Sequence, residues 1–167
     1  MTRGERNNNP LNIRKVAGQH WRGEALPQRG NRLLGAERLG SASDGGQGGE
    51  GAFCCFESMA YGIRAAFCLL RTYRNKYKAN CICDIITRWA PPSENDTPAY
   101  IRNVCKLTGF GGKERLTEAQ WPKLIKAMAR IESQMNLSDE LLERAWKLYQ
   151  PFVRADLQSD RIEYRDL

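Results

Sequence analysis

Two polar clusters in the sequence combine residue types that could do chemistry. The first is RGERNNNPLNIR at residues 3–14, which is rich in asparagine. Asparagine amides both donate and accept hydrogen bonds, which suits the hydroxyl and acetamido groups of sugars. Three asparagines before Pro10 also predict a turn, because asparagine tolerates the left-handed region and bonds its own backbone. The segment therefore has two interpretations: sugar contacts through Asn9 and Asn12, or a turn that caps the first element.

The second cluster is WAPPSENDTPAYI at residues 89–101. A proline-stiffened connection presents Glu94 and Asp96 between Trp89 and Tyr100. A carboxyl group beside aromatic rings is desolvated, which raises its pKa toward the range of a general acid, and sugars stack on exposed aromatic faces. The pattern makes Glu94 a candidate for catalysis or ligand contact.

A structural interpretation of the same cluster stands beside this one. Asp96 or Thr97 would cap a helix that has Pro98 in its first turn, and Trp89 would belong to the core. We favour this interpretation for Thr97 and Trp89. Glu94 is not needed for capping, so its role stays open.

Other chemistries find less support in the residues. His20 is the only histidine and no GxSxG motif accompanies it, which disfavours nucleophilic catalysis. The run DGGQGGEG lacks the Lys-Ser/Thr ending of a phosphate loop. The cysteines occur as CC and CxC rather than paired CxxC, which disfavours zinc. We expect no metal and no cofactor.

Composition and charge bound the class of protein. The chain has 167 residues, of which 41% are apolar, so it can bury a core and is not disordered throughout. No apolar run approaches the roughly 20 residues of a membrane span. A net charge of +7 favours a polyanionic partner: nucleic acid, an anionic membrane or the bacterial cell wall. The basic run at 71–78 is explained by a solvated helix face, so nucleic acid is not expected.

The elements that must position these clusters are mainly helices. Apolar spacing predicts helices at 58–78, 81–89 and 97–108. It predicts a further helix after a capping box at Thr117 and Gln120, and a last one from 138 up to Pro151. Residues 26–52 hold 8 of the 15 glycines and predict a mobile loop. We expect one mainly α domain over 1–167, with a charged tail at 153–167. Its irregular or small-hairpin N-terminal quarter would form one wall of a cleft.

The same motifs carry a family resemblance. RNNNPLNIR, the Trp21-x-Gly23 pair, FESMAYGIRAAFCLL, WAPPSENDTPAYI and a closing TGF occur in this order over residues 3 to about 110. In this order they resemble the small lysozyme-like proteins of bacteriophages and mobile elements, many from Bacteroides-type bacteria. The order is also more loosely similar to glucosaminidase-type wall hydrolases, which carry their catalytic glutamate upstream of an asparagine segment. Glu5 occupies that place here.

The resemblance implies a lysozyme-like fold and cleavage of peptidoglycan glycan strands, as a muramidase, glucosaminidase or lytic transglycosylase. The general acid would be Glu94 or Glu5, and Asp96 or Glu24 would position water in a hydrolase. The expected substrate contacts are Asn9, Asn12, Trp21, Tyr61, Trp89, Asp96 and Tyr100. The alternative is a non-catalytic wall-binding or virion structural module on the same fold.

The N-terminus bears on where such a protein would act. MTRGERNNNPLNIR has no apolar h-region and no cleavage site, so it does not have the pattern of a signal peptide. We expect synthesis in the cytoplasm, with reduced cysteines, and action on the wall after lysis, in a virion or by signal-independent export.

Overall fold

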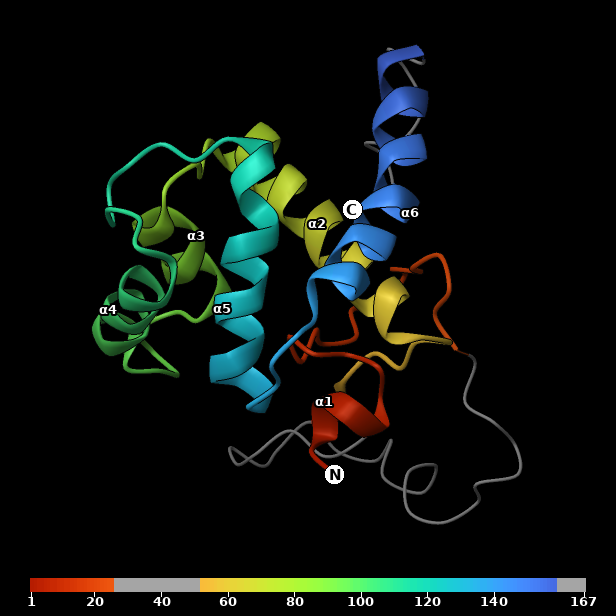
Figure 1. Ribbon diagram of the computed structural model, residues 1–167, viewed down its shortest axis with the longest axis horizontal. Helices are drawn as coiled ribbons and strands as arrows, with labels where there is room; N and C mark the ends of the chain where they lie inside the picture. Colours follow the sequence, from red (N-terminus) through yellow and green to blue (C-terminus); the bar gives the residue numbers. More distant parts are fainter. Residues whose placement is uncertain (26–51, 159–167) are drawn as a thin grey trace.

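A computed structural model describes residues 1–25 and 52–158 of the chain, with side chains up to residue 150 (Figure 1). The predicted mobile loop falls on residues 26–51, which lie outside the described residues. The charged tail likewise lies outside the side chains that are described.

The described residues are mainly helical. The α-helices are α1 (Arg3–Arg6), α2 (Met59–Tyr77), α3 (Ile82–Trp89), α4 (Thr97–Thr108), α5 (Trp121–Ser133) and α6 (Asp139–Gln158), and the 3-10 turn η2 (Glu118–Gln120) precedes α5. In place of a hairpin, the described N-terminal quarter makes two isolated antiparallel bridges, Arg14 to Phe53 and Glu24 to Phe56. The expectation of a mainly α architecture is confirmed. None of the helices in the described ranges is both long and apolar enough to cross a membrane.

Helix α5 stands at the centre of the molecule. Its apolar face supplies Leu124, Ile125 and Met128, which are completely buried. It contacts α2 on one side and α4 on the other, and α1 packs against its C-terminal end. Figure 1 shows α3 and α4 side by side on one flank of α5, and α2 crossing α6 on the other. Residues brought to the C-terminal end of α5 therefore come from both halves of the chain.

The long helix α2 is positioned by aromatic packing. Phe67 is fully buried and meets the Trp146 ring edge-on at 4.9 Å between centroids and the Tyr149 ring at 5.5 Å. Both partners lie on α6. Since edge-to-face aromatic pairs add to the hydrophobic gain of burial, this contact fixes how α6 lies across α2.

A glycine lets the N-terminal segment approach α2. A Cβ atom on Gly62 would fall on the carbonyl oxygen of Asn8. The Asn8 amide donates to the carbonyl of Phe56 over 2.9 Å, just before α2 begins. The glycine thus allows a close backbone approach, which offsets its unfavourable propensity inside a helix.

Helices α4 and α6 differ in local details from the sequence patterns. The N-cap of α4 is Asp96, whose carboxylate accepts from the backbone N–H of Ala99, whereas Thr97 is buried and its hydroxyl donates to the carbonyl of Ala90. Leu107 is exposed and Thr108 takes the inward position. Helix α6 continues through Pro151 to Gln158, although a proline inside a helix removes an intrahelical hydrogen bond and was therefore expected to end it.

Candidate functional site

A carboxyl group that residues of the second sequence cluster hold in place is that of Glu132, one residue before the end of α5. Its Oε1 atom accepts two hydrogen bonds. The indole N–H of Trp89 donates over 3.2 Å and the hydroxyl of Tyr100 donates over 2.9 Å. Both donors fall on the same oxygen, so the second carboxylate oxygen is not engaged by them. The carboxyl group is thereby held in one orientation by two aromatic side chains.

The local fold explains why the two donors converge. Trp89 is the last residue of α3, and Tyr100 lies in the first turn of α4. The bond from the Thr97 hydroxyl to the carbonyl of Ala90 closes the connection between these helices. With Pro91 and Pro92 stiffening that connection, the two rings are presented together toward α5.

Burial and charge act together on Tyr100. The side chain is 8% exposed. Burial, and then the negative charge of Glu132 and the hydrogen bond to it, raise the pKa of the Tyr100 phenol far above its usual range. Tyr100 therefore stays protonated and remains a hydrogen-bond donor to Glu132.

Asn12 brings the first sequence cluster to the same helix end. Its Nδ2 donates to the backbone carbonyl of Glu132 over 3.0 Å. Its Oδ1 is buried and accepts no hydrogen bond within the described part of the chain. The backbone φ of 49° at Asn12 is one that asparagine tolerates better than most residues. A buried acceptor without a donor is costly, so this oxygen is a candidate ligand contact.

An ion pair also joins the two clusters. Arg14 donates from its Nη2 atom to Oε2 of Glu94 over 3.3 Å, with the two side chains 64% and 54% exposed. Such an exposed pair contributes little to stability. Asn12, Arg14, Trp89, Glu94, Tyr100 and Glu132 together are called the Glu132 cluster below. The two motifs singled out in the sequence thus meet at α5, which the sequence patterns did not reveal.

The structure gives Glu5 a local role. Its carboxylate accepts from the backbone N–H of Thr2, and the Thr2 hydroxyl accepts from the backbone N–H of Glu5, which is a capping box on α1. The hydrogen bond from the Thr2 backbone lowers the pKa of the exposed Glu5 carboxyl.

Two predicted substrate contacts have structural roles. Asn9 is completely buried, and its Nδ2 donates to the carbonyls of Ile13 and Cys54, each over 2.9 Å. Its Oδ1 accepts from the backbone N–H of Ile13 over 2.8 Å. This corrects the expectation for Asn9, because its amide has no free valence and no access. The Asp96 carboxylate is likewise used as the N-cap of α4.

Trp21 and Tyr61 lie together at another place. A Cβ atom on Gly23 would fall on the Tyr61 ring, and Gly23 has a φ of 75°. The backbone N–H of Trp21 donates to Oε2 of Glu24 over 3.1 Å, and its indole Nε1 is buried without a described partner. Within the described residues no hydrogen bond or ion pair joins this group to the Glu132 cluster.

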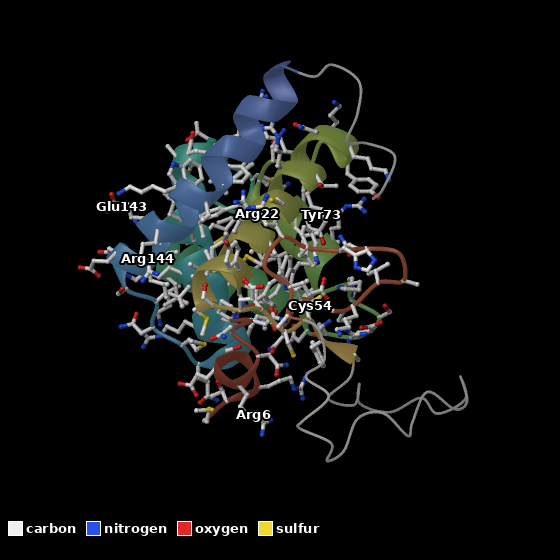
Figure 2. The ribbon with its side chains drawn as sticks, turned by 90° about the vertical axis from the view of Figure 1, so that its right-hand side faces the viewer. Arg6, Arg22, Cys54, Tyr73, Glu143 and Arg144 are labelled. Carbon is white, nitrogen blue, oxygen red and sulfur yellow. The ribbon has the colours of Figure 1, made fainter. Side chains whose placement is uncertain are left out.

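Cys54 lies close enough to Glu24 of this group to be affected by its charge. Burial, and then the charge of Glu24, raise the pKa of its thiol to about 12. Figure 2 shows Cys54 beside the N-terminal segment, with Arg6 of α1 below it. The Cys54 thiol is a buried group rather than a nucleophile.

A hollow of about 830 Å³ lies away from the Glu132 cluster, between α4, α5 and α6. Apolar side chains such as Trp146 and Leu142 line it, and Lys123, Lys126 and Arg130 stand along α5. It contains no member of the cluster. We place the candidate site at the Glu132 cluster, because residues of both sequence motifs converge there on one hydrogen-bonded glutamate.

Glu132 is the site residue that sequence reasoning missed. It follows Ile131 at the end of an amphipathic helix and looks like an ordinary solvated glutamate. Its two donors are 32 and 43 residues away along the chain. No group of histidine, cysteine, aspartate and glutamate side chains in the described ranges could hold a metal ion.

Comparison with known proteins gives one informative relative. The chain is 36% identical over 136 residues to "Protein P5" of Pseudoalteromonas phage PM2, an alignment that covers 80% of this chain and 72% of that protein. No family model matches the chain.

Proposed function

Because the chain belongs to the family of protein P5 from Pseudoalteromonas phage PM2, we propose that it is a bacteriophage-type, lysozyme-like protein that cleaves the glycan strands of peptidoglycan at the Glu132 cluster. The relative's name states no activity, so the proposal rests on the site. The main support is that Trp89 and Tyr100 both donate to the carboxyl group of Glu132, where the clusters at residues 3–14 and 89–101 come together.

The proposed chemistry is general acid catalysis by Glu132. Breaking a glycosidic bond requires that the leaving oxygen be protonated as the bond breaks, and glycosidases use a carboxylic acid for this step. Trp89 and Tyr100 hold Oε1, so the proton transferred to the substrate would come from Oε2. A fixed carboxyl of this kind reduces the entropy that must be lost in reaching the transition state.

The rest of the cluster has supporting roles in this proposal. The unpaired Oδ1 of Asn12 would accept a hydrogen bond from a sugar hydroxyl or acetamido N–H. Glu94, exposed and paired with Arg14, would contact the polymer or position water in a hydrolase. The net charge of +7 favours approach to an anionic wall polymer.

A second candidate function is a wall-binding or virion structural module without turnover. The observation that favours it is that the hydrogen bonds to Glu132 join α3, α4 and α5, which is also what a purely structural carboxylate would do. The residues of the Glu132 cluster would then bind glycan without cleaving it.

Digestion of purified sacculi distinguishes the two candidates. The released fragments are analysed by mass spectrometry. Anhydromuramic acid ends indicate a lytic transglycosylase, and new reducing ends indicate a hydrolase. A protein that pellets with sacculi at physiological salt but releases no fragments would contradict the enzymatic proposal and support the binding module.

A further inference from the structure

We propose that Cys83 of α3 and Cys105 of α4 are a redox pair that closes to a disulfide and fixes α3 to α4. Neither cysteine belongs to the Glu132 cluster, and both are free thiols in this structure. Both are partly exposed, so a small oxidant can reach them.

The geometry that carries the proposal is the approach of both sulfur atoms to Gly112. A Cβ atom built on Gly112 would lie 3.0 Å from Sγ of Cys83 and 3.6 Å from Sγ of Cys105. The two sulfur atoms therefore cannot lie farther apart than the sum of these two distances. The two thiols therefore share one small space beside a residue that has no side chain.

The backbone around Gly112 fixes this arrangement. The backbone N–H of Cys83 donates to the carbonyl of Gly112 over 2.9 Å. Gly109 ends α4 in the left-handed conformation with a φ of 73°, and so turns the chain back toward α3. Any larger side chain at position 112 would displace the Cys83 sulfur.

The effect of Cys83 on the pKa of Cys105 agrees with the proximity of the two thiols. Burial, and then the neighbouring Cys83, raise the pKa of the Cys105 thiol. The Cys105 thiol is therefore held in its protonated form, and closure of the pair requires an oxidising compartment or reagent.

The step balances with a small-molecule disulfide such as oxidised glutathione as the oxidant. One cysteine thiolate attacks a glutathione sulfur, which forms a mixed disulfide and releases one reduced glutathione. The second cysteine thiolate attacks the protein-side sulfur and releases another. Two protein S–H bonds and one glutathione S–S bond are exchanged for one protein S–S bond and two glutathione S–H bonds.

The disulfide would act on the segment that carries most of the Glu132 cluster. The chain between Cys83 and Cys105 includes Trp89, Glu94 and Tyr100. Closing this loop restricts the unfolded chain, so the oxidised protein should melt about 5–10 °C higher than the reduced protein. The connection between α3 and α4 would then be held by a covalent bond in an oxidising environment.

The test is oxidation of the full chain in a glutathione buffer, followed by alkylation of free thiols and tryptic mapping by mass spectrometry. Trypsin yields one peptide with Cys81 and Cys83 (residues 79–88) and one with Cys105 (residues 103–106). We expect these two peptides to be cross-linked in the wild type and in Cys81→Ser, where serine is itself a good N-cap for α3. We expect no such cross-link in Cys83→Ser or Cys105→Ser.

The melting temperature provides a second readout. The rise on oxidation should occur in the wild type and in Cys81→Ser and be absent in Cys105→Ser. Thiols that stay reduced in the oxidising buffer, a bond from Cys105 to Cys81, or bonds only between molecules would overturn the proposal.

Discussion

The Tyr100 hydroxyl donates to Oε1 of Glu132 over 2.9 Å and so joins α4 to α5 at the end of the central helix. Tyr100 is buried, and the carboxyl group that it holds is half-buried. This contact connects a motif recognised in the sequence with a residue that the sequence did not single out.

Removal of the Tyr100 hydroxyl should destabilise the fold. Tyr100→Phe keeps the ring and its packing but removes one donor to a carboxylate, which typically costs about 1.5–3 kcal/mol of unfolding free energy. Urea denaturation at neutral pH measures this. Tyr77→Phe is the matched control, because Tyr77 is 42% exposed. Equal effects of the two substitutions would show that the hydroxyl of Tyr100 has no special partner.

The same contact predicts a dependence on alkaline pH. The pKa of Tyr100 is raised in the folded state, so its stabilising effect is fully present below the unfolded tyrosine pKa of about 10 and is lost as the pH rises beyond it. The difference in unfolding free energy between the wild type and Tyr100→Phe should therefore shrink between about pH 8 and about pH 11. A difference that stays constant or grows over this range would contradict the assigned direction.

Gly62 should tolerate no side chain. Gly62→Ala gains about 1 kcal/mol of helix propensity but drives a methyl group into the carbonyl of Asn8, a backbone atom that cannot move alone. We expect a net loss of roughly 2 kcal/mol or more, measured by thermal or urea unfolding. A methyl group at position 109 would meet open space, so Gly109→Ala is strained only by the positive φ of this residue. That strain costs about 1 kcal/mol of unfolding free energy. A Gly62→Ala protein as stable as Gly109→Ala would refute the close approach.

The Cys54 thiol should be protected in the folded protein. Its pKa is raised to about 12, so almost no thiolate exists near neutral pH. We expect its reaction with a maleimide at about pH 8 to be at least ~10²-fold slower than in the unfolded chain. Mass spectrometry of time points identifies the labelled residue. All six thiols should react after unfolding without reductant, and rapid labelling of Cys54 in the native protein would contradict its burial.

Much of the helical framework could be predicted from local patterns. The apolar stripe with Ile63, Phe67 and Leu70 predicted α2 within one residue at each end, and the predicted capping box of Thr117 and Gln120 is present where η2 leads into α5. These signals depend on residues within one or two helical turns of each other. The N-cap of α4 was assigned one residue late, because aspartate and threonine are both good caps and only tertiary contacts showed that Thr97 turns inward.

The candidate site could be predicted only in part, for a related reason. Trp89, Tyr100 and Asn12 were recognised by type, but Glu132 is selected by contacts across 32 residues or more. Asn9 shows the opposite case. Its amide has the hydrogen-bonding groups of a sugar contact, but it bonds to the backbone of Ile13 and holds its own turn together. Residue type shows what chemistry a side chain can do, whereas long-range packing decides whether the side chain is available for it.

The most direct test of the account is sacculus digestion by Glu132→Gln, which keeps the size of the side chain and an acceptor for Trp89 and Tyr100 but removes the transferable proton. We predict a fall in the rate of fragment release of ~10²-fold or more, with a smaller loss of stability than Tyr100→Phe causes, because glutamine keeps an acceptor for both donors. Glu5→Gln should stay fully active, and Glu94→Gln, which disrupts an exposed ion pair, should lose less than Glu132→Gln. Full activity of Glu132→Gln, with loss in Glu94→Gln or Glu5→Gln, would contradict the assignment and return the catalytic role to one of those two carboxylates.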